Sequence, residues 1–164
     1  MPRPAVSNPE SPAKSDAHHP ASITPTLFAI PHPKFQQNEN ETMAGPQNIT
    51  SAAELQTLLS STTYVVVDFF ADWCPPCKTI APIFESLATK HAVPGTLAFA
   101  KVNVDHNQEA ARTFSVTSMP TFLFFKEGKQ VAVNGQVTIQ GADPRSLMAA
   151  VEKLKGLAAK RAEA

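Results

Sequence analysis

The chain contains two cysteines, Cys74 and Cys77, at a spacing that suits redox chemistry. They enclose Pro75 and Pro76 in the segment WCPPC, which follows a strongly apolar run and opens a segment with helical periodicity. The positive end of a helix favours a thiolate over a thiol, so Cys74 is the expected nucleophile toward a target disulfide. Cys77, one turn further on, is close enough to attack the mixed disulfide and release the reduced target.

Two other uses of the cysteine pair find less support in the sequence. A structural disulfide contributes most when it closes a long loop, and this one would close a very short one. A structural zinc site needs about four Cys or His ligands, and none of the five histidines has a paired spacing with the cysteines. A CxxC pair between a strand and a helix is typical of redox proteins. We therefore predict a redox site without a metal.

The elements that must hold this pair are predicted from the apolar pattern. Apolar runs and turn residues predict strands over residues 64–70, 97–104, 121–126 and 130–139. Inside the last of these, Asn134-Gly135 predicts a bulge or a second tight turn. Helical periodicity and capping residues predict helices over residues 51–60, 75–91 and 108–114. Asp143-Pro144 predicts the start of a final helix whose apolar face comprises Leu147, Met148, Val151 and Leu154.

The order of these elements indicates the fold class. Strands that alternate with helices favour parallel pairing, and the closing hairpin adds antiparallel strands. We predict an α/β fold with a central mixed sheet of four to five strands and helices on both faces.

Composition divides the chain into two parts. Eight of the 15 prolines lie in residues 1–42, which have few large apolar side chains. Such a stretch cannot offset its ordering entropy, so we expect a disordered extension there and a domain over residues 43–164. Met43, at the boundary, is a candidate alternative start.

The charge is balanced, with 14 basic and 14 acidic residues, and gives no reason to expect nucleic acid or an anionic membrane as a partner. The N-terminal residues resemble neither a secretory signal nor a mitochondrial presequence. We expect a cytoplasmic monomer, with mitochondrial and nuclear locations left open.

Several motifs, in order, resemble the thioredoxin family. They are VDFFADWCPPCK at residues 67–78 followed by Ala81-Pro82, AKVNVD at 100–105, SMPT at 118–121 and FFKEG at 124–128. The resemblance covers about residues 48–155. It implies the thioredoxin fold, Cys74 as the attacking thiolate and Cys77 as the resolving thiol. It also implies that Asp68 is the buried carboxylate that assists deprotonation of Cys77. Burial in an apolar strand should raise the pKa of Asp68, although it could instead be a structural hydrogen-bond acceptor.

The resemblance assigns further residues around the pair. Lys101 matches a lysine near the buried carboxylate, or is a plain edge lysine. Pro120 matches a cis-proline, with a trans proline as the alternative, and the backbone of the preceding Met119 would pair with the substrate chain. The remaining substrate-binding matches are Trp73, otherwise a core residue, Gly141, otherwise a turn glycine, and the loop prolines Pro75 and Pro76.

The chain also departs from the family pattern. Pro75 replaces the usual glycine, as in tryparedoxins, nucleoredoxins and membrane-anchored cytochrome-maturation thioredoxins, and leaves the redox potential open. Phe70 stands where many members have tryptophan. The stretch from Gly128 to Gly141 is longer than usual, which puts the match of Gly141 in doubt. Cytochrome-maturation proteins need export or an anchor, and tryparedoxins usually carry insertions before the cis-proline, whereas Cys77 and Pro120 are 43 positions apart here.

The resemblance implies a protein-disulfide reductase that maintains cell redox homeostasis through electron transport. It would bind no cofactor and would use NADPH indirectly through thioredoxin reductase. Implied targets are peroxiredoxins, methionine sulfoxide reductases and ribonucleotide reductase. The alternatives are a tryparedoxin/nucleoredoxin-like oxidoreductase, or a non-catalytic binding module or chaperone that uses the apolar face around Trp73.

Overall fold

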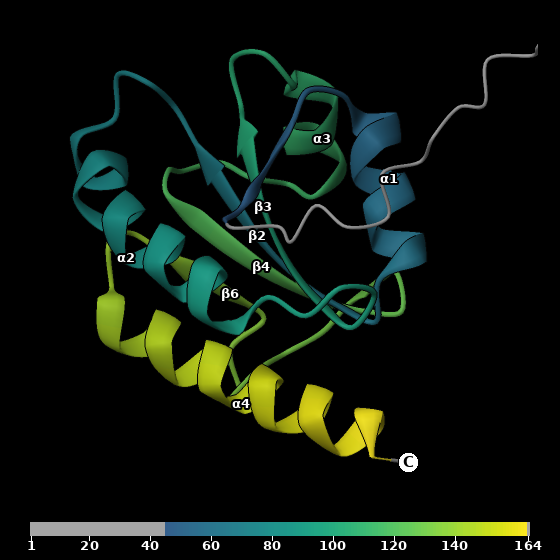
Figure 1. Ribbon diagram of the computed structural model, residues 1–164. Coiled ribbons are helices and arrows are strands. Elements are labelled where there is room, and N and C mark those ends of the chain that lie inside the picture. The colour runs from purple at the N-terminus through teal and green to yellow at the C-terminus, as the bar shows by residue number, and fades with distance from the viewer. Residues whose placement is uncertain (1–44, 164) are drawn as a thin grey trace, which may run out of the picture. The chain divides into compact units, whose positions relative to one another are not determined.

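The computed structural model describes residues 45–163, which contain a mixed sheet between two layers of helices (Figure 1). The predicted extension over residues 1–42 and the candidate start at Met43 lie outside the described residues. In chain order the elements are β1 (Gln47–Ile49), α1 (Ala52–Ser61), β2 (Tyr64–Phe70), α2 (Pro75–His91), β3 (Leu97–Asn103), α3 (Gln108–Thr113), β4 (Thr121–Lys126), β5 (Lys129–Gln130), β6 (Thr138–Gln140) and α4 (Pro144–Ala162).

The sheet has the strand order β1-β3-β2-β4, and both β5 and β6 pair with the free side of β4. Strands β1, β3 and β2 are parallel, as the alternation of strands and helices predicts. Strand β4 runs antiparallel to β2. The predicted α/β architecture with a mixed sheet is therefore confirmed.

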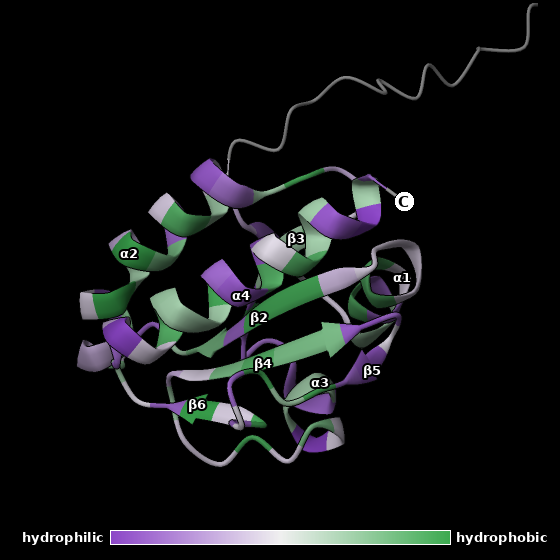
Figure 2. Ribbon diagram, turned by 90° about the horizontal axis from the view of Figure 1, so that it is seen from below, coloured by the Kyte–Doolittle hydropathy of each residue, from purple (hydrophilic) through white to green (hydrophobic). Residues whose placement is uncertain are grey.

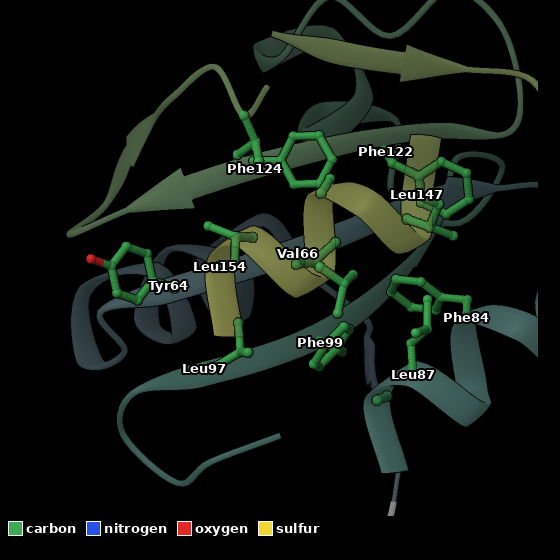
Figure 3. Packing of buried hydrophobic residues seen from close by; sticks show 14 of the residues in the cluster. Tyr64, Val66, Phe84, Leu87, Leu97, Phe99, Phe122, Phe124, Leu147 and Leu154 are labelled. Atoms are coloured by element: carbon green, nitrogen blue, oxygen red, sulfur yellow. The ribbon is translucent and has the colours of Figure 1, made fainter. Parts of the chain in front are cut away.

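Strand β2 is buried on both faces because helices cover both sides of the sheet. Successive side chains of a strand point to opposite faces. Val66 therefore lies in the core beneath α2 and α4, where it packs with Phe84, Phe99 and Leu147 (Figure 3). Its neighbour Val67 lies in the second core, beneath α1 and α3. Hydrophobic and hydrophilic residues alternate along α2 and α4 (Figure 2), and the buried residues of both helices are apolar.

The helices begin where the capping residues predict. Ser51 Oγ accepts a hydrogen bond from the backbone N–H of Glu54 at 3.1 Å. Asp143 caps α4, and Pro144 occupies its first turn, where a missing N–H costs nothing. Hydrogen bonds from the side chain and backbone of Ser146 lower the pKa of the Asp143 carboxyl.

Three details of the structure differ from the sequence-based prediction. The strand predicted over residues 130–139 is interrupted, because Asn134 and Gly135 adopt positive φ angles of 52° and 81° and form a tight turn, which is one of the two predicted alternatives. Met148 is 43 % exposed, so it lies outside the apolar face predicted for the last helix. The short edge strand β1 was not predicted. With β1 added and the last strand divided, the sheet of the described domain has six strands instead of four to five.

No helix within residues 45–163 combines the length and apolar character needed to cross a membrane.

Candidate active site

The cysteine pair lies where the chain leaves β2 and enters α2. Cys74 is the N-cap of α2, and Pro75 and Pro76 form its first turn. The two cysteines are joined by a disulfide, with their Cα atoms 5.3 Å apart. Both residues are buried, at 3 % and 4 % exposure. Exposure therefore does not distinguish the attacking sulfur from the resolving one.

Hydrogen bonding does distinguish the two sulfurs. The backbone N–H of Cys77 donates to Cys74 Sγ at 3.2 Å. Pro75 and Pro76 have no N–H, so the first amide of the helix that is able to reach this sulfur is that of Cys77. The amide and the positive helix end both favour negative charge on Cys74.

The loop that precedes β4 lies against the cysteine pair. The Met119-Pro120 peptide bond is cis, as the resemblance implies. The carbonyl oxygen of Met119 lies 3.6 Å from Cys74 Sγ. The side chain of Met119 is partly buried and packs against Ala71 and the two cysteines. Gly141 donates its N–H to the carbonyl of Pro120 at 2.8 Å, so the structure brings it next to the cis-proline despite the longer preceding stretch.

Trp73 is exposed beside the cysteine pair, with 64 % of its surface accessible, and is not a core residue. Its indole Nε1–H donates to Asp105 Oδ2 at 2.9 Å. The Asp105 backbone N–H in turn donates to Asn103 Oδ1 at 3.0 Å. The Asn103 side-chain amide donates to Asp72 Oδ2 at 2.9 Å. These bonds connect the loop after β2 to the end of β3.

The sequence motifs contain Asp72, Asn103 and Asp105 but predict no role for them. The available signal was their position. Asp72 follows β2, and Asp105 follows the adjacent parallel strand β3. The carboxyl ends of neighbouring parallel strands meet at one edge of the sheet, which places polar side chains there within reach of each other.

Asp68 lies in the middle of β2 and is 1 % exposed. Burial raises the pKa of its carboxyl to about 7, while Lys101 lowers this pKa and Glu85 raises it. Its Oδ1 atom is buried and has no hydrogen-bond partner among the described residues. The predicted rise in the pKa is thus confirmed, and no partner fixes Oδ1 as a structural acceptor.

Lys101 is the register partner of Asp68 on β3. Its ammonium Nζ binds Glu85 Oε1 at 3.1 Å and lies 5.0 Å from the centre of the Phe70 ring. The Lys101 side chain is 15 % exposed, which is less than expected for a plain edge lysine. The residue is therefore beside the buried carboxylate, as the resemblance implies, but its charge is bound to Glu85.

Within residues 45–163, no group of three or more His, Cys, Asp or Glu side chains is arranged to hold a metal ion. The described site consists of two sulfurs, one buried carboxyl, an exposed indole and the Met119-Pro120 backbone.

Comparison with known proteins gives a consistent result. The family model described as Thioredoxin matches residues 46–153. A thioredoxin-like protein of Fusarium culmorum is 75 % identical over 114 residues, which are 70 % of this chain and 94 % of that protein. A thioredoxin of Neurospora crassa is 57 % identical over 120 residues, or 73 % of this chain and 94 % of the relative.

Solved structures show the same likeness. The thioredoxin of Malassezia sympodialis superposes with a TM-score of 0.59 at 35 % identity, covering 68 % of this chain and 92 % of that one. The thioredoxin of Fasciola hepatica gives a TM-score of 0.57 at 42 % identity, covering 65 % and 96 %. With the CxxC disulfide at the start of α2 and the family match over most of the described domain, the chain belongs to the thioredoxin family.

Proposed function

We propose that this thiol–disulfide oxidoreductase acts in the cell as a general reductase of protein disulfides, with Cys74 as its nucleophile. The observation that carries the assignment is the 3.2 Å hydrogen bond from the Cys77 amide to Cys74 Sγ at the helix end. A sulfur stabilised in this way ionises more readily to a thiolate, and it is also a better leaving group than its neighbour.

The proposed reaction is a two-step exchange that starts from the reduced pair. The Cys74 thiolate attacks one sulfur of the target disulfide, forming a mixed disulfide while the other target sulfur leaves and takes a proton. Cys77 then loses its proton and attacks Cys74 Sγ. The bond between Cys74 and the target breaks, and the second target sulfur leaves as a thiol. The target gains two electrons and two protons, and the cysteine pair becomes the disulfide seen in the structure.

Asp68 is proposed to accept the proton of Cys77 in the second step. A general base works best when its pKa is near the operating pH, and burial raises the pKa of Asp68 to about 7. Asp68 is 1 % exposed, so bulk water has little direct access to this carboxyl. Lys101 is proposed as a supporting residue, because its positive charge limits this rise in the pKa and so leaves part of Asp68 ionised and able to accept a proton near neutral pH.

The groove that receives the target is proposed to lie between the exposed Trp73 and the loop at Met119 and Pro120. The Met119 backbone, next to Cys74, is proposed to pair with an extended target segment as an added strand. Pro75, Pro76 and Gly141 are proposed to complete the walls of this groove.

The electron supply and the targets follow from family membership and are part of the proposal. NADPH would reduce the pair through thioredoxin reductase. Proteins such as peroxiredoxins, methionine sulfoxide reductases and ribonucleotide reductase would be the targets. A cytoplasmic location and a monomeric state complete the proposal, and imaging of a fusion to the full chain together with sedimentation analysis would test them.

Pro75 favours one other candidate. WCPPC is also the motif of tryparedoxins and nucleoredoxins, so a reductase with a different electron donor stays an alternative. A measured potential of about −270 mV would fit a general reductase, and one of about −120 mV would fit an oxidant.

Insulin reduction tests the proposal. Wild type should reduce insulin when NADPH and thioredoxin reductase are supplied, Cys74→Ser should be inactive, and Cys77→Ser should stop after forming the mixed disulfide. A protein active only with another dithiol donor would favour the tryparedoxin-like alternative. A binding module that prevents insulin aggregation equally well without Cys74 would contradict the proposal.

A further inference from the structure

Among charged groups, Lys101 has the largest effect on the pKa of the buried Asp68, and its ammonium is paired with a residue on another element. Lys101 lies opposite Asp68 in the β2–β3 register. Its Nζ atom is bonded 3.1 Å from Glu85 Oε1, and Glu85 belongs to α2. The Asp68 Oδ1 atom has no partner among residues 45–163, although a lysine occupies the neighbouring register position. The Lys101 ammonium therefore acts on two carboxyl groups, those of Asp68 and Glu85, and forms its ion pair with the more exposed one, Glu85.

We infer that Glu85 is a positioning residue for proton transfer at the cysteine pair, because it holds the ammonium of Lys101 away from Asp68. The inference rests on the proposed role of Asp68 as the base for Cys77. The Glu85 side chain is 52 % exposed, and an ion pair this exposed adds little to stability. Its main physical effect is therefore on the position of the Lys101 charge.

Few charged groups face Asp68, so the effect of Glu85 on the pKa of Asp68 is not masked by other charges. Strand β3 contributes Lys101, and α2 contributes Glu85. The register partner on β4 is the apolar Phe122. The buried residues of α4, on the same side of the sheet, are all apolar and comprise Leu147, Ala150, Val151, Leu154 and Ala158. Helix α2 also carries Cys77, whose thiol titrates when the pair is reduced.

Two consequences of Glu85 act in the same direction. Its negative charge raises the pKa of Asp68 directly. By binding Lys101 Nζ, it also keeps the Lys101 ammonium from donating a hydrogen bond to the Asp68 carboxylate. Such a hydrogen bond would lower the pKa of Asp68. Glu85 thus keeps Asp68 able to take a proton near neutral pH, and without Glu85 the carboxyl would ionise at lower pH and be a weaker base.

The test is the titration of the Asp68 carboxyl carbon, followed by NMR in the oxidised protein labelled with ¹³C-aspartate. The oxidised form keeps the Cys77 thiol out of the measurement. Glu85→Gln should lower the titration midpoint by about half a pH unit or more, because a nearby like charge is lost and Lys101 is released. Glu85→Asp keeps the charge and should stay closer to wild type. A midpoint that is unchanged or higher in Glu85→Gln overturns the inference.

A matched control variant and a second genetic background distinguish an effect through the position of Lys101 from a direct effect of the Glu85 charge. Glu152→Gln removes a similarly exposed glutamate on α4 that pairs with Lys155 and His91, and should leave the midpoint unchanged. In a Lys101→Met background, Glu85→Gln should have a clearly smaller effect. An effect of full size without Lys101 would contradict a role through that lysine.

The pH profile of insulin reduction gives the functional readout. The acidic limb of the Glu85→Gln profile should move to lower pH, and Asp68→Asn should abolish this difference. An altered Asp68 titration with an unaltered profile would contradict the positioning role, whereas wild type that fails to reduce insulin at any pH would contradict the proposed function instead.

Discussion

The backbone N–H of Cys77 lies 3.2 Å from the Sγ of Cys74, across two prolines that have no N–H of their own. This contact distinguishes two sulfurs that are almost equally buried. In the proposed reaction it stabilises Cys74 as an anion and as a leaving group, whereas Cys77 depends on a separate base.

Replacing either cysteine with serine should give different adducts. Cys77→Ser should accumulate mixed disulfides with target proteins, because the resolving attack is lost. Cys74→Ser should form few adducts, since the remaining thiol lacks the amide contact. The measurement is mass spectrometry of proteins captured from an oxidised lysate, with the double variant as the control. More adducts on Cys74→Ser than on Cys77→Ser would reverse the assignment.

Replacing Asp68 with Asn should raise stability more at high pH than at low pH. The pKa of Asp68 is raised from 3.8 to about 7 in the folded protein. Its contribution to stability is therefore complete below pH 4 and is lost progressively as the pH rises through about 7. The gain in the free energy of unfolding should be larger at pH 8 than at pH 5 by about 3 kcal/mol, by this linkage.

Urea denaturation at the two pH values measures this difference, and the constant cost of burying the Asn amide cancels between them. The exposed Glu109→Gln change is the control and should show no such pH dependence. Equal changes in the free energy of unfolding for Asp68→Asn at pH 5 and pH 8 would show that the pKa of Asp68 is not raised in the folded protein. Turnover of the Asp68→Asn variant should also be slower, because the proposed base for Cys77 is absent.

Removing the acceptor for the Trp73 indole should loosen this side chain. Asp105→Ala deletes the partner of the 2.9 Å hydrogen bond from Trp73 Nε1. Because Trp73 is the one tryptophan of the chain, time-resolved fluorescence anisotropy reports its motion without interference. We expect faster local motion and a loss of insulin reduction of about threefold, the worth of one modest hydrogen bond.

The control for this prediction is Asp72→Ala, which removes a bond to Asn103 but leaves the Trp73 acceptor in place. Its effect on indole motion should be smaller. Identical anisotropy in Asp105→Ala and wild type would mean that the hydrogen bond does not hold the indole.

Ser115 should be replaceable by glycine with a gain in stability. It follows α3 with a φ of 54°, in the left-handed region. Its N–H bonds to the carbonyl of Arg112, and the N–H of Val116 bonds to Ala111, which is the helix end that favours glycine at this position. Ser115→Gly should stabilise the protein by about 1 kcal/mol.

Thermal unfolding measures this gain. The exposed Ser86→Gly change, inside α2, provides the opposite control and should destabilise the protein by about 0.5–1 kcal/mol. A lower melting temperature for Ser115→Gly would show that the serine makes a contact that outweighs its backbone strain.

The sequence predicts those parts of the fold that local patterns determine. The bounds of β2, α2 and β4 agree with their apolar runs and with the capping role of Cys74. Strand β1 was missed because three residues with a single buried side chain carry almost no pattern. The division of the last strand was left open because Asn134-Gly135 suits a bulge as well as a turn.

The sequence predicts a site residue only where a family motif contains it or where its apolar surroundings make it unusual. Asp68 is recognisable as an acid within an apolar strand. The bonds of Asp105 to Trp73 and of Glu85 to Lys101 join residues 32 and 16 positions apart. Exposed polar residues at such separations have no local signal, because their contact depends on strand register and helix placement.

The central claim is that Cys74 is the reactive sulfur of the pair. The most direct measurement is the pH dependence of iodoacetamide alkylation of the reduced protein, with each modified cysteine located by mass spectrometry. We expect rapid modification of Cys74 with a midpoint clearly below the value of about 8.5 for a free thiol, and slow modification of Cys77. Two cysteines that react at the same rate, with the midpoint of an ordinary thiol, would contradict the account.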